Sequence, residues 1–442
     1  MKNVLTIICL SLTSATTGAQ SPALAQTQAK SPSRDVASSG TTDSYPGHWN
    51  QWRGPQRSGH VPATTWPKRL NKTNLQQAWR IPLGPSYSGP VVSDELVFTT
   101  STENKKTEVV TAFQRSTGKV VWRTEWAGSM TVPFFAGRNG SWIRSTPAFD
   151  GESLFVAGMR DVLVSLDAKT GKERWRVDFV KRFKSNGESF GFVCSPIVDD
   201  DSVYVQTGAG VVKLDKKSGA TKWLTLKDKG GMFGGAFSSP IRTKLAGRDH
   251  LLVQSRTALS GVDPASGAVL WSADVKSFRG MNILTPLPHG NSVFTSAYGG
   301  RGHRFTVSDT DGKLAVDRKW TNRVQAYMSS PVAVDGHAYV YLRSRRLCCM
   351  HLDSGELKWT SPPISDEYWS LVANGDRILA LSESGELLLI AANPERFEIV
   401  DRMNVVESET WAHLAVDGNQ ILIRALDGLI AFTWNQASAS RK

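Results

Sequence analysis

One ten-residue phrase decides the fold: Leu166-Asp167-Ala168-Lys169-Thr170-Gly171-Lys172-Glu173-Arg174-Trp175. Asp followed by Thr-Gly is typical of a tight turn, because the Asp side chain accepts hydrogen bonds from nearby backbone N–H groups and Gly supplies a positive φ. The phrase therefore predicts a turn that joins two strands, with the tryptophan in the second strand.

The phrase returns along the chain. It recurs in residues 214–223 and 262–271, more loosely in 113–122, and two residues shorter in 352–359. In all five units Gly precedes Trp by four residues. A turn signature repeated every 40–50 residues or so is typical of a propeller, and one indole per sheet can wedge against the next sheet and bury about 200 Å². The repeat tryptophans are Trp79, Trp122, Trp175, Trp223, Trp271, Trp320 and Trp359.

A second signal marks the innermost strand of each unit: a small residue and then Pro, which is tolerated where a strand begins. Two further units begin without Pro, at Ser370-Leu371 and His413-Leu414. Together these starts predict an all-β fold, an eight-bladed β-propeller of four-stranded antiparallel blades, with seven blades as the alternative. The six starts with Pro are Gly89-Pro90, Thr146-Pro147, Ser195-Pro196, Ser239-Pro240, Thr285-Pro286 and Ser330-Pro331.

The two ends of the repeat region complement each other. The eighth unit ends after its third strand, at residues 429–432, and residues 75–82 form a fourth strand that belongs to no unit. We expect the N-terminal strand to complete the last blade, since a closed ring leaves no sheet edge open. The Trp/Pro-rich segment 48–74 is expected to pack on the propeller, which spans 75–434.

The N-terminal sequence suggests that the protein is exported. Residues 1–25 have the charged start, short apolar core and small-residue cleavage site of a signal peptide, with cleavage near Ala25. Residues 26–47 are Ser/Thr/Gln/Ala-rich and predict a disordered leader, and 435–442 form a C-terminal tail. The mature protein is therefore expected to be periplasmic or secreted, without a transmembrane segment.

The formal net charge of +12 favours anionic partners. Nucleic acid is not expected, because the chain is exported and carries no helix-based or zinc-based reading motif. Peripheral contact with anionic surfaces stays open, as does a basic surface that is merely solvated.

The Asp-x-x-Thr-Gly-x-x-x-Trp phrase resembles the pyrroloquinoline-quinone-type repeat, which makes eight-bladed propellers. The segment Trp52-Arg53-Gly54-Pro55 resembles exported bacterial proteins in the non-enzymatic branch of that family. The match covers roughly residues 49–434. Within that family it resembles the periplasmic propeller of the outer-membrane barrel-assembly machinery, although no Cys stands at the cleavage site for a lipid. The resemblance implies a scaffold that binds proteins in the cell envelope.

An enzyme is the first alternative, because quinone-dependent alcohol dehydrogenases share these repeats. They also need a calcium site, an Asp base, a stacking Trp and usually a vicinal cysteine pair. Cys348-Cys349 aligns with Val162-Leu163 in the middle of a third strand, so we expect two strand cysteines on opposite faces. We find no haem motif, no metal-ligand spacing among the eight histidines, and no nucleophile elbow. No catalytic residue, cofactor or metal ligand is assigned, and the question of an enzyme stays open.

The candidate binding residues lie where each blade's outer strand connects to the next inner strand, because these connections line the mouth of the central channel. Aromatic and Met side chains there suit partner recognition, although they can equally cover the inner core. The candidates are Tyr87, Trp142, Arg144, Phe192, Phe237, Met281, Tyr327, Met328, Tyr368, Trp369, Trp411 and His413.

Charge also differs around this rim. The connections of the earlier units are basic and those of the last two are acidic, a split that can orient a charged partner or arise by chance. We therefore expect a scaffold for envelope proteins, with an oxidoreductase or a module for anionic envelope polymers as alternatives. The rim charges are Arg138, Arg144, Lys181, Arg182, Lys184, Arg279, Arg323, Asp366, Glu367, Glu407 and Glu409.

Overall fold

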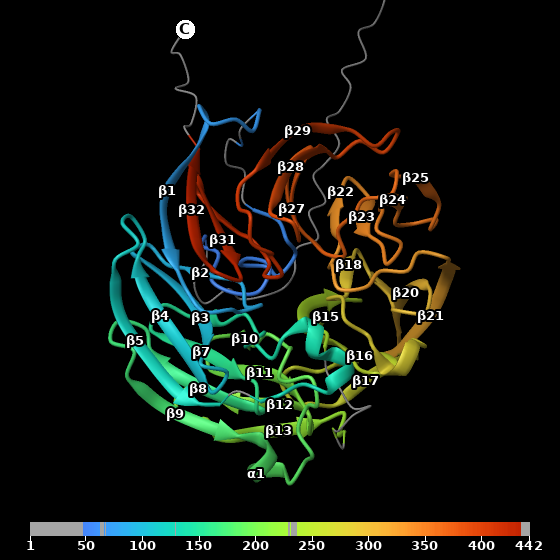
Figure 1. The fold of residues 1–442 in the computed structure, drawn as a ribbon. Coiled ribbons are helices and arrows are strands. Elements are labelled where there is room, and N and C mark those ends of the chain that lie inside the picture. Colours follow the sequence, from blue (N-terminus) through green and yellow to red (C-terminus); the bar gives the residue numbers. More distant parts are fainter. Residues whose placement is uncertain are drawn as a thin grey trace, which may run out of the picture. The chain divides into compact units, whose positions relative to one another are not determined.

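The structure, a computed structural model, describes residues 47–61, 66, 68–128, 130–228, 230 and 237–434, without the side chains of residues 138 and 139. Within these ranges the strands form eight four-stranded antiparallel sheets arranged in a ring (Figure 1). The predicted all-β, eight-bladed propeller is confirmed, and the seven-bladed alternative is wrong. The predicted signal peptide, most of the leader, and the tail lie outside the described residues.

Each of blades 1 to 4 is one continuous stretch of chain, with its strands in sequence order from the channel outwards. The strands are β2 (Val91–Val92), β3 (Leu96–Glu103), β4 (Thr107–Gln114) and β5 (Val120–Ala127) in blade 1; β6 (Ala148–Phe149), β7 (Ser153–Gly158), β8 (Val162–Asp167) and β9 (Glu173–Asp178) in blade 2; β10 (Ile197–Val198), β11 (Ser202–Thr207), β12 (Gly210–Asp215) and β13 (Thr221–Thr225) in blade 3; and β14 (Ile241–Leu245), β15 (Arg248–Gln254), β16 (Ala258–Val262) and β17 (Val269–Asp274) in blade 4.

Blades 5 to 7 follow the same order, and blade 8 takes its outer strand from the segment that precedes blade 1. The strands are β18 (Leu287–His289), β19 (Ser292–Ser296), β20 (Gly302–Thr310) and β21 (Lys313–Asn322) in blade 5; β22 (Val332–Val334), β23 (His337–Tyr341), β24 (Leu347–His351) and β25 (Leu357–Thr360) in blade 6; β26 (Trp369–Asn374), β27 (Arg377–Ser382), β28 (Glu386–Ala391) and β29 (Ile399–Asn404) in blade 7; and β30 (Ala415–Asp417), β31 (Gln420–Ala425), β32 (Gly428–Trp434) and β1 (Leu75–Pro82) in blade 8.

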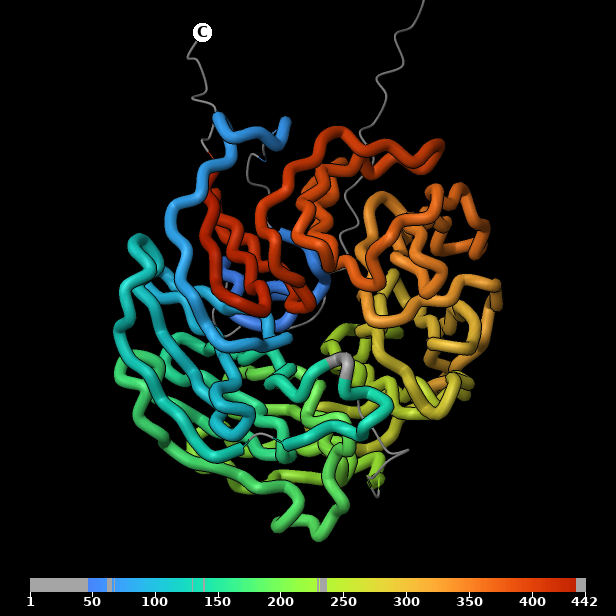
Figure 2. The backbone as a smooth tube through the Cα atoms, in the orientation of Figure 1, coloured from blue at the N-terminus to red at the C-terminus, as the bar shows by residue number. Residues whose placement is uncertain are grey.

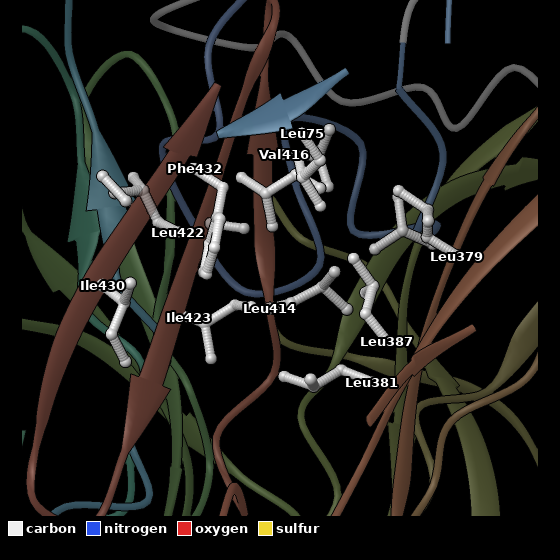
Figure 3. Packing of buried hydrophobic residues seen from close by; sticks show 14 of the residues in the cluster. Leu75, Leu379, Leu381, Leu387, Leu414, Val416, Leu422, Ile423, Ile430 and Phe432 are labelled. Carbon is white, nitrogen blue, oxygen red and sulfur yellow. The ribbon is translucent and has the colours of Figure 1, made fainter. Parts of the chain in front are cut away.

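The ring closes through β1, as the sequence predicts. This strand pairs antiparallel with β32, in a register that runs from Leu75 opposite Trp434 to Pro82 opposite Gly428. In Figure 1 the blue β1 lies beside the red β32. Apolar side chains of blade 8 pack against those of blade 7, and Figure 3 shows Leu75, Ile423 and Phe432 on one side and Leu379 and Leu387 on the other.

The Asp-Thr-Gly turn forms as predicted, through capping by the Asp side chain and a positive φ at the glycine. Asp167 Oδ1 accepts hydrogen bonds from the backbone N–H of Lys169 (3.1 Å) and of Thr170 (2.9 Å). Gly171 has φ +71°, a conformation that costs a side-chain-bearing residue strain. Hydrogen bonds from Arg174 and Thr170 lower the pKa of Asp167 to about 2, so the capping carboxylate is ionised at neutral pH.

Six of the seven repeat tryptophans pack on the turn of the next blade, and Trp271 is the exception. The indole N–H of Trp122 donates to the carbonyl of Ala168 at 2.8 Å, and a Cβ added to Gly171 would lie 2.4 Å from the same ring. The turn glycine therefore supplies both the backbone conformation and the space for the indole. The other indole-to-carbonyl bonds that cross a blade interface are Trp79 to Arg115, Trp175 to Lys216, Trp223 to Pro264, Trp320 to Leu352 and Trp359 to Asn393.

The small residue before each Pro also has a structural role. The backbone N–H of Thr146 donates to Ser195 Oγ at 3.0 Å, and that of Ser195 donates to Ser239 Oγ at 2.9 Å. Gly89 and Thr285 make the same bond to the hydroxyls of Thr146 and Ser330. These bonds link the starts of neighbouring inner strands around the channel.

Candidate functional site

The mouth of the channel is the end where each fourth strand connects to the next first strand. Because the strands alternate in direction, the turns between second and third strands lie at the same end. Three short helices sit in these connections: η1 (Phe134–Asn139), α1 (Phe179–Phe183) and η2 (Phe278–Gly280). The Asp-Thr-Gly turns lie on the opposite face.

The channel itself is occupied by the segment that precedes β1. Residues 49–61, which we call the plug, run inside the ring in dark blue in Figure 2. The plug makes a hydrogen bond to an inner strand, or to the start of one, in every blade. The bonded pairs are Trp49 with Val92, Asn50 with Phe149, Arg57 with Pro196 and Pro240, Trp52 with Thr285, Arg53 with Pro331, Gly59 with Ala373, and Trp49 with Asp417.

Two buried arginines anchor the plug. Arg57 donates to the carbonyls of Pro196 (2.8 Å), Pro240 (2.9 Å) and Ser195 (3.0 Å), and Arg53 donates to those of Pro331 and Ser58. Burial lowers the pKa of each guanidinium to about 9, which still leaves both charged at neutral pH. Carbonyl dipoles, rather than a carboxylate, therefore offset the cost of burying these charges.

The sequence-predicted residues of blades 8, 1 and 7 come together at the mouth. Trp411 stacks on Tyr368 with 6.0 Å between ring centroids, and Tyr87 lies 5.9 Å from Trp411. The Arg144 guanidinium sits 5.1 Å from the centroid of Tyr87, and Trp142 contributes a side-chain hydrogen bond to the Tyr87 hydroxyl. Burial raises the pKa of Tyr87 to about 12, so this group is a neutral aromatic surface with one cation beside it.

A second aromatic row crosses blades 1 to 4. Phe135 packs on Phe190 (6.1 Å), and Phe190 packs on the predicted Phe237 (5.6 Å). Phe134 continues the row and is 94% exposed. Sequence reasoning missed Phe134 and Phe135, although an adjacent Phe pair in Pro133-Phe134-Phe135-Ala136-Gly137 is a recognisable signal of an exposed apolar turn.

A third group lies on blades 4 to 6. Tyr298 stands 4.6 Å from the predicted Tyr327 and 5.6 Å from Phe278, and the Arg343 guanidinium lies 4.5 Å from the Tyr298 centroid. Tyr298 and Arg343 were also missed, since they come from turns between second and third strands, which the repeat alignment did not compare. Met281 follows η2 directly, and its N–H donates to Phe278.

Four predicted residues are not exposed recognition groups. Phe192, Tyr368, Trp369 and His413 are all buried, with Trp369 only 1% exposed compared with 8% for the repeat residue Trp79. For Tyr368 and Trp369, a position on an inter-blade connection therefore does not give more exposure than the repeat tryptophans have. Trp369 begins β26 and stacks on Tyr341 at 4.8 Å within the core between blades 6 and 7.

The other buried residues have similar reasons. His413 lies against Trp49 (5.9 Å) and Trp52 (5.2 Å), and therefore serves the plug. Phe192 packs on Phe179 of α1. The remaining candidates Tyr87, Trp142, Arg144, Phe237, Met281, Tyr327, Met328 and Trp411 are half-buried.

Carboxylates gather beside the first aromatic group. Glu383 accepts a hydrogen bond from the N–H of Glu367 (2.8 Å), and Trp411 donates its indole N–H to Glu409 (2.8 Å). Burial, with the nearby charges of Glu367, Glu409 and Asp366, raises the pKa of Glu383. The acidic part of the predicted charge split thus lies at the mouth of blades 7 and 8.

Cys348 and Cys349 are free thiols in the middle of β24. Cys348 packs into the core toward blade 5 and Cys349 into the core toward blade 7, as expected for neighbours on a regular strand. Within the described ranges, no group of three His, Cys, Asp or Glu side chains is placed to hold a metal ion. None of the helices there is long and apolar enough to cross a membrane.

Known proteins resemble this chain in sequence. A family model described as "Outer membrane protein assembly factor BamB" matches residues 105–361. The protein of that name from Yersinia pestis is 25% identical over 269 residues, which cover 55% of this chain and 64% of that protein, less than two thirds of its length. The one from Moranella endobia is 22% identical over 387 residues, which cover 82% of this chain and 91% of that protein.

Solved structures agree on the fold. BamB from Moraxella catarrhalis superposes with a TM-score of 0.60 at 16% identity, over 83% of this chain and 99% of that chain. A quinohemoprotein alcohol dehydrogenase from Comamonas testosteroni superposes with a TM-score of 0.59 at 12% identity, over 90% of this chain and 82% of that chain. At these identities the likeness shows a shared propeller and does not separate a scaffold from an enzyme.

Proposed function

The chain belongs to the family described as outer membrane protein assembly factor BamB, and from this premise we propose that it is a periplasmic scaffold in outer-membrane assembly that binds protein partners at the channel mouth. The family's role in outer-membrane protein assembly supports the process. The partner-binding part of the proposal is carried by one observation: the mouth presents three aromatic groups above a channel that the chain fills with its own plug.

The presence of the plug favours binding of partners at the surface of the mouth over binding of a ligand inside the channel. Arg53 and Arg57 occupy the space between the inner strands, whereas aromatic side chains remain accessible around the rim. Half-buried aromatics that become fully desolvated are the side chains that dominate protein interfaces. The likeness to an alcohol dehydrogenase, at 12% identity, concerns the fold alone and lends the oxidoreductase alternative no support of its own.

Affinity capture from envelope extract tests the proposal. We expect the wild-type protein to retain an outer-membrane assembly component, and Trp411→Ala or Tyr327→Ala to weaken that retention by about 1–2 kcal/mol while folding is preserved. Lys217→Ala, an exposed change on the opposite face, is the matched control. Unchanged capture by both mouth variants, with loss in Trp49→Ala or Trp52→Ala, would assign recognition to the N-terminal segment instead.

The periplasmic location is a proposal that rests on the predicted signal peptide. Fractionation followed by N-terminal sequencing of the mature protein tests it. We expect a start near residue 26 and recovery with the periplasm or outer membrane. A mature chain that begins at Met1 in the cytoplasm would contradict both the location and the proposed process.

A further inference from the structure

The mouth side of blades 4 to 6 carries a connected row of rings. Phe278 of η2 contacts Tyr298 in the β19–β20 turn, and Tyr298 contacts Tyr327 in the β21–β22 connection. Backbone bonds fix this geometry, because the N–H of Phe278 donates to the Tyr298 carbonyl at 2.7 Å. We call this row the blade 4–6 aromatic row.

Two guanidiniums lie on the row. Arg343 is 4.5 Å from the centroid of Tyr298, and Arg279 is 5.2 Å from that of Phe278. Gln325 holds Arg343 in place, since its Oε1 accepts from Arg343 Nη1 (3.3 Å) and from the N–H of Gly299 (3.2 Å). Arg343 is therefore positioned before any ligand arrives.

More positive charge flanks the row. The backbone turn next to Arg301 packs against the carbonyl of Lys276, and Arg323 follows the outer strand that pairs with β20. All five cations, Lys276, Arg279, Arg301, Arg323 and Arg343, are exposed, and none forms an ion pair with a carboxylate in the described part of the chain. The neighbouring Arg345, by contrast, is paired with Glu367 at 2.6 Å.

The arrangement selects for one ligand chemistry. Each stacked guanidinium has a face covered by a ring, which leaves its N–H edge for a planar, bidentate acceptor such as a carboxylate. A sugar would need a free ring face, and an arginine lies over Tyr298 and another over Phe278. Insertion into lipid needs a set of projecting apolar side chains, whereas only Phe278 is exposed here and Tyr298 and Tyr327 are half-buried.

We propose that the blade 4–6 aromatic row, with Arg279 and Arg343 stacked on it, is a docking site for an acidic segment of a protein partner. The inference rests on the proposed function as a scaffold and names the chemistry of one partner surface. Carboxylates of the segment pair with the guanidinium edges, while the rings hold the guanidiniums in position and exclude water from one side.

Fluorescence anisotropy with a labelled poly-glutamate peptide tests the site on the full-length protein. We expect binding that weakens as NaCl is raised. Arg279→Glu/Arg343→Glu should weaken it about tenfold or more, because two exposed ion pairs become repulsive. Lys217→Glu/Lys313→Glu carries the same change in net charge on the opposite face and should leave binding nearly unchanged. Tyr298→Leu, which removes the platform under Arg343 and keeps all charges, should weaken binding about threefold.

Three outcomes would overturn the inference. The first is no binding of poly-glutamate at low salt, and the second is an equal loss in both charge-reversed variants. The third is that Arg279 and Arg343 are needed for binding to phosphatidylglycerol vesicles and not for binding to poly-glutamate. The two proposals fail separately. If envelope capture depends on Trp411 but poly-glutamate does not bind, the acidic-segment site is wrong and the scaffold function stands. If poly-glutamate binds but no envelope protein is captured, the scaffold function is wrong and the acidic-segment site stands.

Discussion

Blades 1 and 2 meet through an indole on a glycine turn, whereas blades 4 and 5 meet through an arginine on a tighter turn. Trp122 donates its N–H to Ala168 across the first interface. At the second, Trp271 is equally buried, but its N–H has no acceptor in the described part of the chain. Arg248 instead donates to the carbonyl of Gly312 (2.8 Å) and pairs with Asp309 (2.7 Å).

The difference shows that the repeat tryptophan depends on the turn that receives it. Blade 5 joins its outer strands directly at Asp311-Gly312 and lacks the Asp-Thr-Gly turn. Blade 8 has no such turn, because its third strand β32 and its outer strand β1 are not consecutive in the sequence. Blade 7 accordingly has Val400 in place of tryptophan, and Arg69 and Leu70 hydrogen-bond to Val400 and Asp401 there.

The largest effect should come from removing the N-terminal segment, which supports the interface between blades 7 and 8, where Val400 stands in place of a tryptophan. Deletion of residues 48–82 takes away the plug and β1, which exposes the edge of β32 and empties the channel. We expect loss of cooperative unfolding, or a greatly lowered Tm, by circular dichroism and calorimetry. A deleted protein that keeps the wild-type Tm would contradict the closure of the ring through β1.

Trp122→Ala and Trp271→Ala compare the two kinds of interface at matched burial. Trp122→Ala should lower the free energy of unfolding by about 3–5 kcal/mol, the usual cost of removing a large aromatic from a packed site. Trp271→Ala should cost about 1 kcal/mol less, because no interface hydrogen bond is lost with the ring. Urea unfolding of both variants measures this, and a larger cost for Trp271→Ala would reverse the comparison.

Phenylalanine isolates the hydrogen bond from the bulk of the ring. Trp122→Phe leaves the Ala168 carbonyl without its donor and should cost about 1 kcal/mol more than Trp271→Phe, which removes a buried donor that has no acceptor. Equal midpoints for the two variants in the same urea titration would mean that the indole N–H bonds do not stabilise the interfaces.

The smallest effect should come from Arg248, which contacts blade 5 where the other interfaces have an indole on a turn. Arg248→Ala should cost about 0.5–1 kcal/mol, since its ion pair is partly exposed and screened by solvent. The control is Arg402→Ala, whose pair with Glu386 lies within one blade. If the control costs as much as Arg248→Ala, the arginine has no special role at the blade 4–5 interface.

Much of the fold could be predicted because each signal is local. The Asp167 cap, the positive φ of Gly171 and the spacing to Trp175 all lie within ten residues, and repetition turns them into a blade count. Closure followed from matching an unassigned strand to an incomplete unit. The exception at blade 5 is also local, since Asp311-Gly312 is itself a hairpin signal.

The site was harder to predict because it is assembled from distant turns. Tyr298 and Arg343 meet only because blades 5 and 6 are neighbours in the ring. The buried guanidiniums of Arg53 and Arg57 carry no sequence signal, since their acceptors are carbonyls that the ring brings together. Position in a connection likewise did not separate the half-buried Trp411 from the buried Trp369.

In-cell photo-cross-linking tests the central claim most directly. A photoreactive residue at position 411, on the channel mouth, should form a cross-link to a component of outer-membrane assembly, identified by mass spectrometry. The same residue at position 217, on the opposite face, should not. Cross-links to that component from position 217 and none from position 411 would contradict recognition at the mouth.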